Sequence, residues 1–252
     1  MMSAKARLPS AMAQVMRAAA IDSCRDVVRD LSEVEALRQS KKGTASFVAF
    51  ALRRIEKRLV TAVLKGRSDE GVMTLSAYQS GEIGSGDFLL APMDGVSNFS
   101  RGIAHFAVAL AYRYQGDVLA AVIYDVARGE LFEAWQGGGA RLEQHRIRCG
   151  TTTRLRDCVI GIDGTRPPGK DKQAQWRRLG SASLALAWVA CGRWDGFVAE
   201  QVPLPIAAAG SVLVREAGGL VDRTDKPHRT AQILAAHPNC HAHLKRLWTH
   251  HV

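Results

Sequence analysis

One carboxylate at the end of an apolar run is the residue of this sequence best placed for chemistry. The run begins at Phe88, continues through Ala91 and ends at Asp94-Gly95. Such a run, closed by an Asp-Gly pair, is typical of a buried strand followed by a tight turn. At this edge a carboxylate can bind a cation while turn N–H groups bind an anion such as phosphate. We therefore identify Asp94 as a candidate metal ligand and Gly95, Ser97 and Asn98 as a candidate phosphate loop.

The residues around this turn predict helices before it and a meander after it. Apolar residues at helical spacing predict a first helix with a stripe from Met12 to Leu31, and a second helix from about Ser46 to Lys65. Three strands follow, separated by short Gly-containing turns: Phe106–Tyr114, Val118–Tyr124 and Glu130–Trp135.

Strands and helices alternate in the second half. The pattern predicts strands at Cys158–Ile162, Phe197–Glu200 and Ile233–Ala236, and helices at Ser181–Ala190, from about Pro205 to Ala217, and at Asn239–Trp248. Neither a linker nor an internal repeat interrupts the chain. We expect a single domain over residues 1–252, with halves of about 1–150 and 151–252, and a layered α/β (α+β) architecture.

The net charge of the chain is a guide to the kind of partner that it could bind. The 252 residues contain 34 Lys and Arg against 24 Asp and Glu, a formal net charge of +10. The surplus indicates either an ordinary solvated basic surface or attraction to RNA, another polyanion or an acidic protein. A basic surface is predicted from Lys41, Lys42, Arg53, Arg54, Lys57 and Arg58, the last four on a basic face of the second helix.

Location is predicted from apolar runs, cysteines and the N-terminus. No run of about 18 uncharged apolar residues is present, so no membrane span is expected. The five cysteines are scattered without paired metal spacing and indicate incidental thiols of a reducing compartment. We expect a cytoplasmic protein, with organellar import through the basic N-terminus as the alternative. The terminal histidines, including His241 and His243, are interpreted as a solvated tail.

Several segments, in order, resemble one known family. They are Lys41-Lys42-Gly43 to Glu56, Ala91 to Phe99, Ala104 to Ala109, Gly192 to Phe197 and Leu213 to Gly219. On these residues the chain resembles the inositol monophosphatase family, of the bacterial inositol-1-monophosphatase and extragenic suppressor type. The family signature at the apolar run is Asp-Pro-(Ile/Leu)-Asp-Gly-Thr-Thr-Asn-Phe. The resemblance implies an α-β-α-β-α sandwich and Mg²⁺-dependent hydrolysis of a phosphate monoester.

The sequence departs from the family at several positions where family members have carboxylates. Those positions fall on Leu52, Tyr78 (with Gln79), Ala91 and Ile206, and the second Asp of the signature is retained as Asp94. The family's substrate-contacting Glu falls near Ala199, beside Glu200. Mg²⁺ prefers hard oxygen ligands, which apolar side chains do not offer. Three acids are candidates to compensate for the lost ligands: Glu82, Asp87 and Glu200.

These departures lead to two main hypotheses. We expect a catalytically degenerate member retained as a binding or assembly module, without a cofactor and with no residue assigned as catalytic. Its expected partners are RNA or a protein complex, and a second copy in a homodimer, since the resemblance includes bacterial relatives that act in transcription antitermination. The alternative is a Mg²⁺-dependent phosphatase acting on inositol monophosphate or a similar small phosphomonoester. A third interpretation is RNA binding through the basic helix face.

Overall fold

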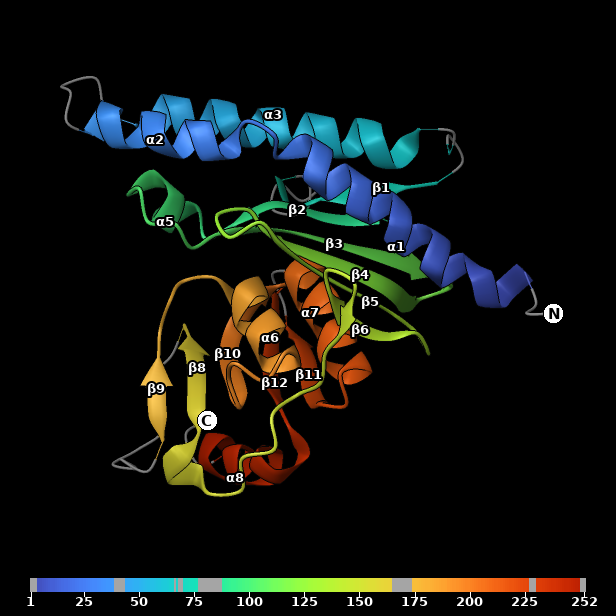
Figure 1. The fold of residues 1–252 in the computed structure, drawn as a ribbon, viewed down its shortest axis with the longest axis vertical. Helices are drawn as coiled ribbons and strands as arrows, with labels where there is room; N and C mark the ends of the chain where they lie inside the picture. The colour runs from blue at the N-terminus through green and yellow to red at the C-terminus, as the bar shows by residue number, and fades with distance from the viewer. Residues whose placement is uncertain are drawn as a thin grey trace.

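Helices at the N-terminus lie on one face of a large sheet (Figure 1). The computed structural model describes residues 4–38, 44–65, 67, 70–76, 88–164, 174–226 and 230–249. The N-terminal helices are α1 (Ala4–Ser23), α2 (Val27–Arg38) and α3 (Ala45–Leu64). The buried side chains of α3, from Val48 to Val63, recur at helical spacing and fix which side of the helix faces the sheet.

The first sheet has seven strands in chain order among the described residues. They are β1 (Val72–Thr74), β2 (Phe88–Asp94), β3 (Ala107–Tyr114), β4 (Asp117–Asp125), β5 (Glu130–Trp135), β6 (Gly139–Leu142) and β7 (His145–Arg146). Strand β1 pairs with β2 in parallel, and each later pair is antiparallel. A short helix, α5 (Val96–Ser100), follows β2 directly. The end of β2 therefore meets the start of α5 at Gly95.

The second sheet has the strand order β11-β12-β10-β8-β9. Its elements, with the helices between them, are the 3₁₀ turn η1 (Leu155–Asp157), β8 (Val159–Asp163), β9 (Gln175–Arg177), α6 (Ala182–Ala190), β10 (Gly196–Pro203), α7 (Leu204–Glu216), β11 (Leu220–Lys226), β12 (Thr230–Ala236) and α8 (Pro238–Thr249). Strand β8 runs parallel to β10 and β9, and the other pairs are antiparallel.

The helices and the two sheets form five layers, with three apolar cores between them. Helices α1–α3 share one core with the first sheet, α6 and α7 fill the space between the two sheets, and α8 packs on the outer face of the second sheet (Figure 1). This arrangement confirms the predicted layered α-β-α-β-α sandwich.

The largest difference from the predicted elements is in the first helix. The stripe assigned to one helix is divided between α1 and α2 by a turn at Cys24–Asp26, where Val27 N donates to Cys24 O at 3.0 Å. The turn changes the phase of the helical repeat, so Val28, expected to face inward, is 57% exposed. Strand β11, which has a polar outer face, was not predicted.

Within the described ranges, no helix has the length and apolar character needed to cross a bilayer.

Candidate functional site

Asp94 is the last residue of β2, where the strand leaves the first sheet and enters the turn before α5. The pairing of β2 with β3 shifts register between Ala91 and Asp94. This irregularity releases the end of the strand from regular pairing, as bulges near functional sites do. The carboxylate of Asp94 thereby turns toward the N-terminal end of α6.

Two serines of the second half hold this carboxylate. Asp94 Oδ2 accepts hydrogen bonds from Ser181 Oγ at 2.9 Å, from Ser183 N at 2.7 Å and from Ser183 Oγ at 2.7 Å. Ser181 is also the N-cap of α6, accepting from Leu184 N at 3.4 Å. A carboxylate is favoured beside the free N–H groups of a helix N-terminus. The sequence had not assigned these serines to the site, although a Ser before an apolar helix is an N-cap signal.

The turn after Asp94 requires glycine. Gly95 has φ +89°, and a Cβ there would lie 2.8 Å from His105 O. Asn98 fixes the loop from the other side, because its Nδ2 donates to His105 O at 2.8 Å and to Leu179 O at 2.7 Å. Ser97 is exposed. The predicted loop of Gly95, Ser97 and Asn98 thus lies beside Asp94, with Asn98 joining the two halves of the chain.

Burial affects the chemistry of Asp94. Loss of solvent around the carboxylate raises its pKa, opposed by the hydrogen bonds from Ser183 and Ser181, and the like charge of Asp163 raises it further. All three described hydrogen bonds reach Oδ2, and no described residue donates to Oδ1. With respect to the described residues, one carboxylate oxygen is therefore available to a cation or a water molecule.

The positions at which this sequence replaces the family's carboxylates with apolar residues also have apolar surroundings. Ala91 on β2 and Ile206 on α7 are 0% and 1% exposed, and both belong to the core between the sheets. Leu52 is half-buried on α3 and packs against the N-terminal core. None of these three side chains carries an oxygen that could bind a metal. Tyr78 and Gln79 lie outside the described residues.

Of the three acids predicted to compensate for the lost metal ligands, the structure describes only one. Glu200 is half-buried on β10, but Glu82 and Asp87 lie outside the described residues. The structure adds Asp163, at the end of β8, as a carboxylate close enough to Asp94 to affect its pKa. Sequence reasoning missed it because β8 and β2 belong to different sheets.

The carboxylates among the described residues are enough to bind one hard cation but not two. Mg²⁺ is commonly held by one or two carboxylates together with substrate phosphate and several waters. Asp94, with Asp163 nearby, meets that requirement. A two-ion site needs further carboxylates, and Ala91 and Ile206 offer none.

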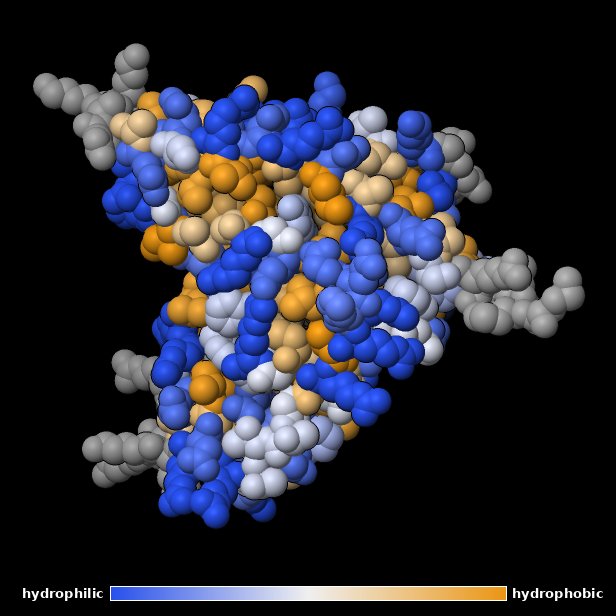
Figure 2. Space-filling view, viewed as in Figure 1, coloured by the Kyte–Doolittle hydropathy of each residue, from blue (hydrophilic) through white to orange (hydrophobic). Residues whose placement is uncertain are grey.

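The basic face of α3 is largely engaged within the protein. Arg54 pairs with Asp30 of α2, and Arg58 pairs with Asp26 at 2.9 Å. Arg53 and Lys57 are exposed, and hydrophilic side chains follow the outer edge of this helical layer (Figure 2). Of the predicted basic surface, Lys41 and Lys42 lie outside the described residues, and Arg54 and Arg58 are paired with acids of α2 and of the turn before it.

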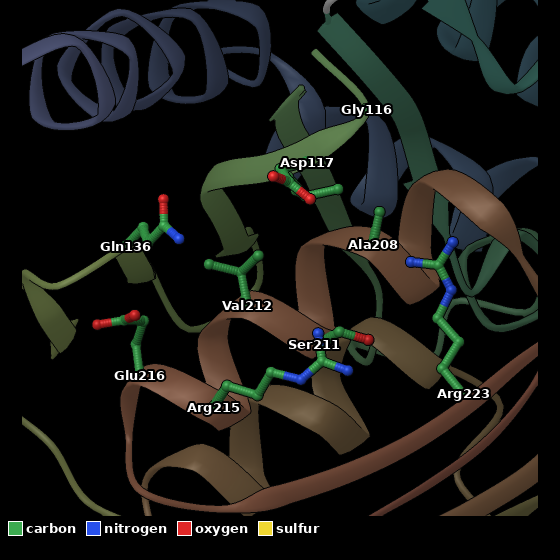
Figure 3. Close-up of a pocket in the computed structure, with 10 residues that line it drawn as sticks. Gly116, Asp117, Gln136, Ala208, Ser211, Val212, Arg215, Glu216 and Arg223 are labelled. Carbon is green, nitrogen blue, oxygen red and sulfur yellow. The ribbon is translucent and has the colours of Figure 1, made fainter. Parts of the chain in front are cut away.

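A pocket of about 370 Å³ lies away from Asp94, between α7, the start of β4 and β11 (Figure 3). Arg215, Arg223 and Glu216 line it. Arg223 is bound to Asp225 at 2.7 and 2.9 Å, and Glu216 accepts the N–H groups of Gly137 and Gly139. None of the residues predicted for the site lines this pocket. Glu216 joins α7 to the turn between β5 and β6, and Arg223 is paired within β11.

Comparison with known proteins places this geometry in context. The family model described as the inositol monophosphatase family matches residues 8–251. An inositol-1-monophosphatase of Rhizobium meliloti is 37% identical over 225 residues, covering 83% of this chain and 84% of that protein. The Nus factor SuhB of Escherichia coli K12 is 35% identical over 235 residues, covering 84% and 86%.

Solved structures agree with this similarity. The extragenic suppressor protein suhB of Bartonella henselae superposes with a TM-score of 0.80 at 32% identity, covering 99% of this chain and 100% of that one. The Thermotoga maritima IMPase TM1415 superposes with a TM-score of 0.71 at 28% identity, covering 79% and 81%.

These relatives correct one main expectation. The hypothesis of a catalytically degenerate binding module is wrong, because relatives 37% identical over most of the chain carry the name inositol-1-monophosphatase. The lost ligand positions had been given too much weight, since one cation needs fewer carboxylates than two. The expectation of no cofactor is likewise unsupported. Matched by the family model over nearly its whole length, the chain belongs to the inositol monophosphatase family.

Proposed function

We propose that this protein hydrolyses a small phosphomonoester, such as inositol monophosphate, with the aid of Mg²⁺. The observation that carries the proposal is Asp94, held at a strand–turn edge with one carboxylate oxygen open. The names of the 37%-identical relatives supply the substrate class. Phosphate would lie at the Gly95–Asn98 turn, where backbone N–H groups are the natural partners of an anion.

The protein's own residues position the reactive carboxylate. Ser181 and Ser183 orient Asp94 from the N-terminus of α6, and Asn98 fixes the adjoining turn. Asp94 would hold the cation, and Asp163 is the second carboxylate near it. When bound, Mg²⁺ neutralises phosphate charge and polarises the phosphoryl group. Asp163, which lies near Asp94 at the end of β8, is the described carboxylate that would accept a proton from the attacking water.

The test is turnover of pure protein on inositol monophosphate and a panel of small phosphomonoesters, with and without Mg²⁺. We expect phosphate release that requires Mg²⁺ and is lost in Asp94→Asn. Asp117→Asn, which changes an exposed carboxylate on β4, is the matched control and should retain full activity. Phosphate release that is equal with EDTA, or unchanged in Asp94→Asn, would contradict the proposal.

Association with a polyanionic partner is a second candidate activity. It is supported by the net charge of +10 and by the 35%-identical relatives named Nus factor SuhB. Exposed Arg53 and Lys57 are the cations of α3 to test, since Arg54 and Arg58 are paired with acids. Binding to a structured RNA should weaken with salt and in Arg53→Glu/Lys57→Glu. Binding that is insensitive to both changes would exclude this surface.

A further inference from the structure

Three side chains that are far apart in the sequence form a buried cluster in the second half. Cys158, His237 and Cys240 are all buried, and one potential ligand atom of each lies within 4.8 Å of the others. The sequence alone had indicated scattered cysteines without metal spacing. The fold brings these residues together in the core between the second sheet and α8.

The topology explains why they meet. Cys158 immediately precedes β8, and His237 immediately follows β12; both strands pair with β10, on its opposite sides. His237 also opens α8, since Cys240 N and His241 N donate to His237 O at 3.0 and 3.1 Å. In that first helical turn His237 and Cys240 are three residues apart. This His-x-x-Cys spacing is the local signal that the sequence analysis overlooked.

His237 is a buried imidazole whose ring nitrogens lack a well-formed hydrogen bond among the described residues. It is 0% exposed, and neither Nδ1 nor Nε2 forms a hydrogen bond within the described structure. An unsatisfied buried polar group costs about 1–3 kcal/mol, so such groups in native proteins call for an explanation. Since an imidazole nitrogen of His237 lies close to two sulfur atoms, a bound metal ion is the partner that all three side chains share.

Asp195 completes the surroundings of the imidazole. Its Oδ1 lies 3.4 Å from His237 Nε2, and its Oδ2 accepts a hydrogen bond from Val159 N at 2.8 Å. A histidine that binds a metal commonly presents its other ring nitrogen to a carboxylate, which orients the ring. With Nδ1 as the metal ligand, Asp195 takes that role at Nε2, and Asp195 is itself held by the backbone of β8.

We propose that Cys158, His237 and Cys240 bind one Zn²⁺ ion that fastens α8 to the second sheet. Thiolate and imidazole are preferred Zn²⁺ ligands, at about 2.0–2.3 Å. Two thiolates and a neutral imidazole around Zn²⁺ give a net charge of zero, which suits a core where an unpaired ion would be costly. Three protein ligands leave one coordination position for water or a further oxygen. The site lies between the second sheet and α8, whereas Asp94 is bonded to the N-terminal end of α6, so the zinc site is separate from the proposed phosphatase site.

The first test measures binding of the metal alone. The full-length protein, purified with a reductant and stripped of metal, is titrated with Zn²⁺ and, separately, with Co²⁺. We expect one equivalent of zinc per chain by elemental analysis, and visible absorption of Co²⁺ in a tetrahedral thiolate site. Cys158→Ser and Cys240→Ser should lose both signals. Cys24→Ser, which alters a buried cysteine in another core, is the matched control and should retain them.

The second test needs no variant and therefore does not depend on a variant's folding. In the wild-type protein, alkylation of the buried Cys158 and Cys240 requires α8 to open, so bound Zn²⁺ should slow it, while the rate at Cys191, in the core between the sheets, should be equal with and without zinc. Asp195→Asn should weaken zinc binding by roughly 10–100-fold without abolishing it.

Three results would overturn the proposal. One is wild-type protein that takes up no Zn²⁺ or Co²⁺. Another is stoichiometric zinc retained in Cys158→Ser/Cys240→Ser. The third is a Cys158–Cys240 disulfide in protein isolated without metal, which would assign the pair a redox role instead.

Discussion

The two simplest substitutions at Asp94 should separate its structural role from its chemical role. In Asp94→Ala three donors lose their acceptor: Ser181 Oγ, Ser183 N and Ser183 Oγ. Ser181 and Ser183 are 3% and 0% exposed, so water replaces the carboxylate poorly. At about 1 kcal/mol for each orphaned donor, the free energy of unfolding should fall by about 3 kcal/mol.

Asp94→Asn should behave differently, because the amide oxygen still accepts from Ser181 and Ser183. Burial raises the pKa of Asp94, so the charged form is less favourable in the folded protein than in the unfolded chain. A folded-state pKa above the unfolded value means that stability declines as pH rises past the unfolded carboxyl value. Removing the charge should therefore leave stability at neutral pH equal to that of wild type or higher.

Activity, unlike stability, should not distinguish the two variants. Both remove the carboxylate that would hold the cation, so both should lose turnover on the phosphomonoester. A loss of about 3 kcal/mol in transition-state stabilisation corresponds to a decrease of about a hundredfold in kcat/KM.

Urea denaturation and phosphate release, measured on the same preparations, test this reasoning. The two denaturation curves should separate, while the two rates should fall together. Asp94→Ala as stable as wild type would refute the hydrogen-bond argument. Wild-type kcat/KM in Asp94→Asn would refute the assignment of Asp94 as the cation ligand.

The remaining predictions concern metal, pH and packing. Mg²⁺ at about a hundred times its Kd should stabilise wild-type protein by about 2.7 kcal/mol, and a thermal shift that persists in Asp94→Asn would place the cation elsewhere. Hydrogen bonds from Arg193 at 2.5 Å hold the pKa of Glu130 below its ordinary value. That stabilisation is present above the unfolded carboxyl pKa and is lost as pH falls through the folded value. Glu130→Gln should therefore reduce the free energy of unfolding at pH 7 by no more than about 1 kcal/mol, and the difference from wild type should vanish in acid; a constant difference across the titration would exclude the ion pair as its cause. A Cβ at Gly210 would lie 2.1 Å from Leu186 Cδ1, so Gly210→Ala should destabilise the packing of α6 on α7 by about 1–3 kcal/mol, and an unchanged denaturation midpoint would show that Leu186 moves aside freely.

The sequence by itself determined most of the elements. Helix α3 and the meander β3–β5 follow from short-range periodicity and Gly-containing turns, and the structure places each within a few residues of its predicted bounds. The Asp94–Gly95 turn was also predictable, because an apolar run closed by Asp-Gly has few alternatives. The α/β class and the layered sandwich followed from the order of these elements and from the resemblance.

The tertiary structure alone decided which side chains meet. Ser181 and Ser183 reach Asp94 across a sequence separation of 87 and 89 residues, and no local pattern specifies that contact. Cys158 joins His237 and Cys240 only because β8 and β12 flank β10 in the second sheet. Periodicity encodes the face that each element buries. The partner across that face depends on strand order and layer packing, which are properties of the whole chain.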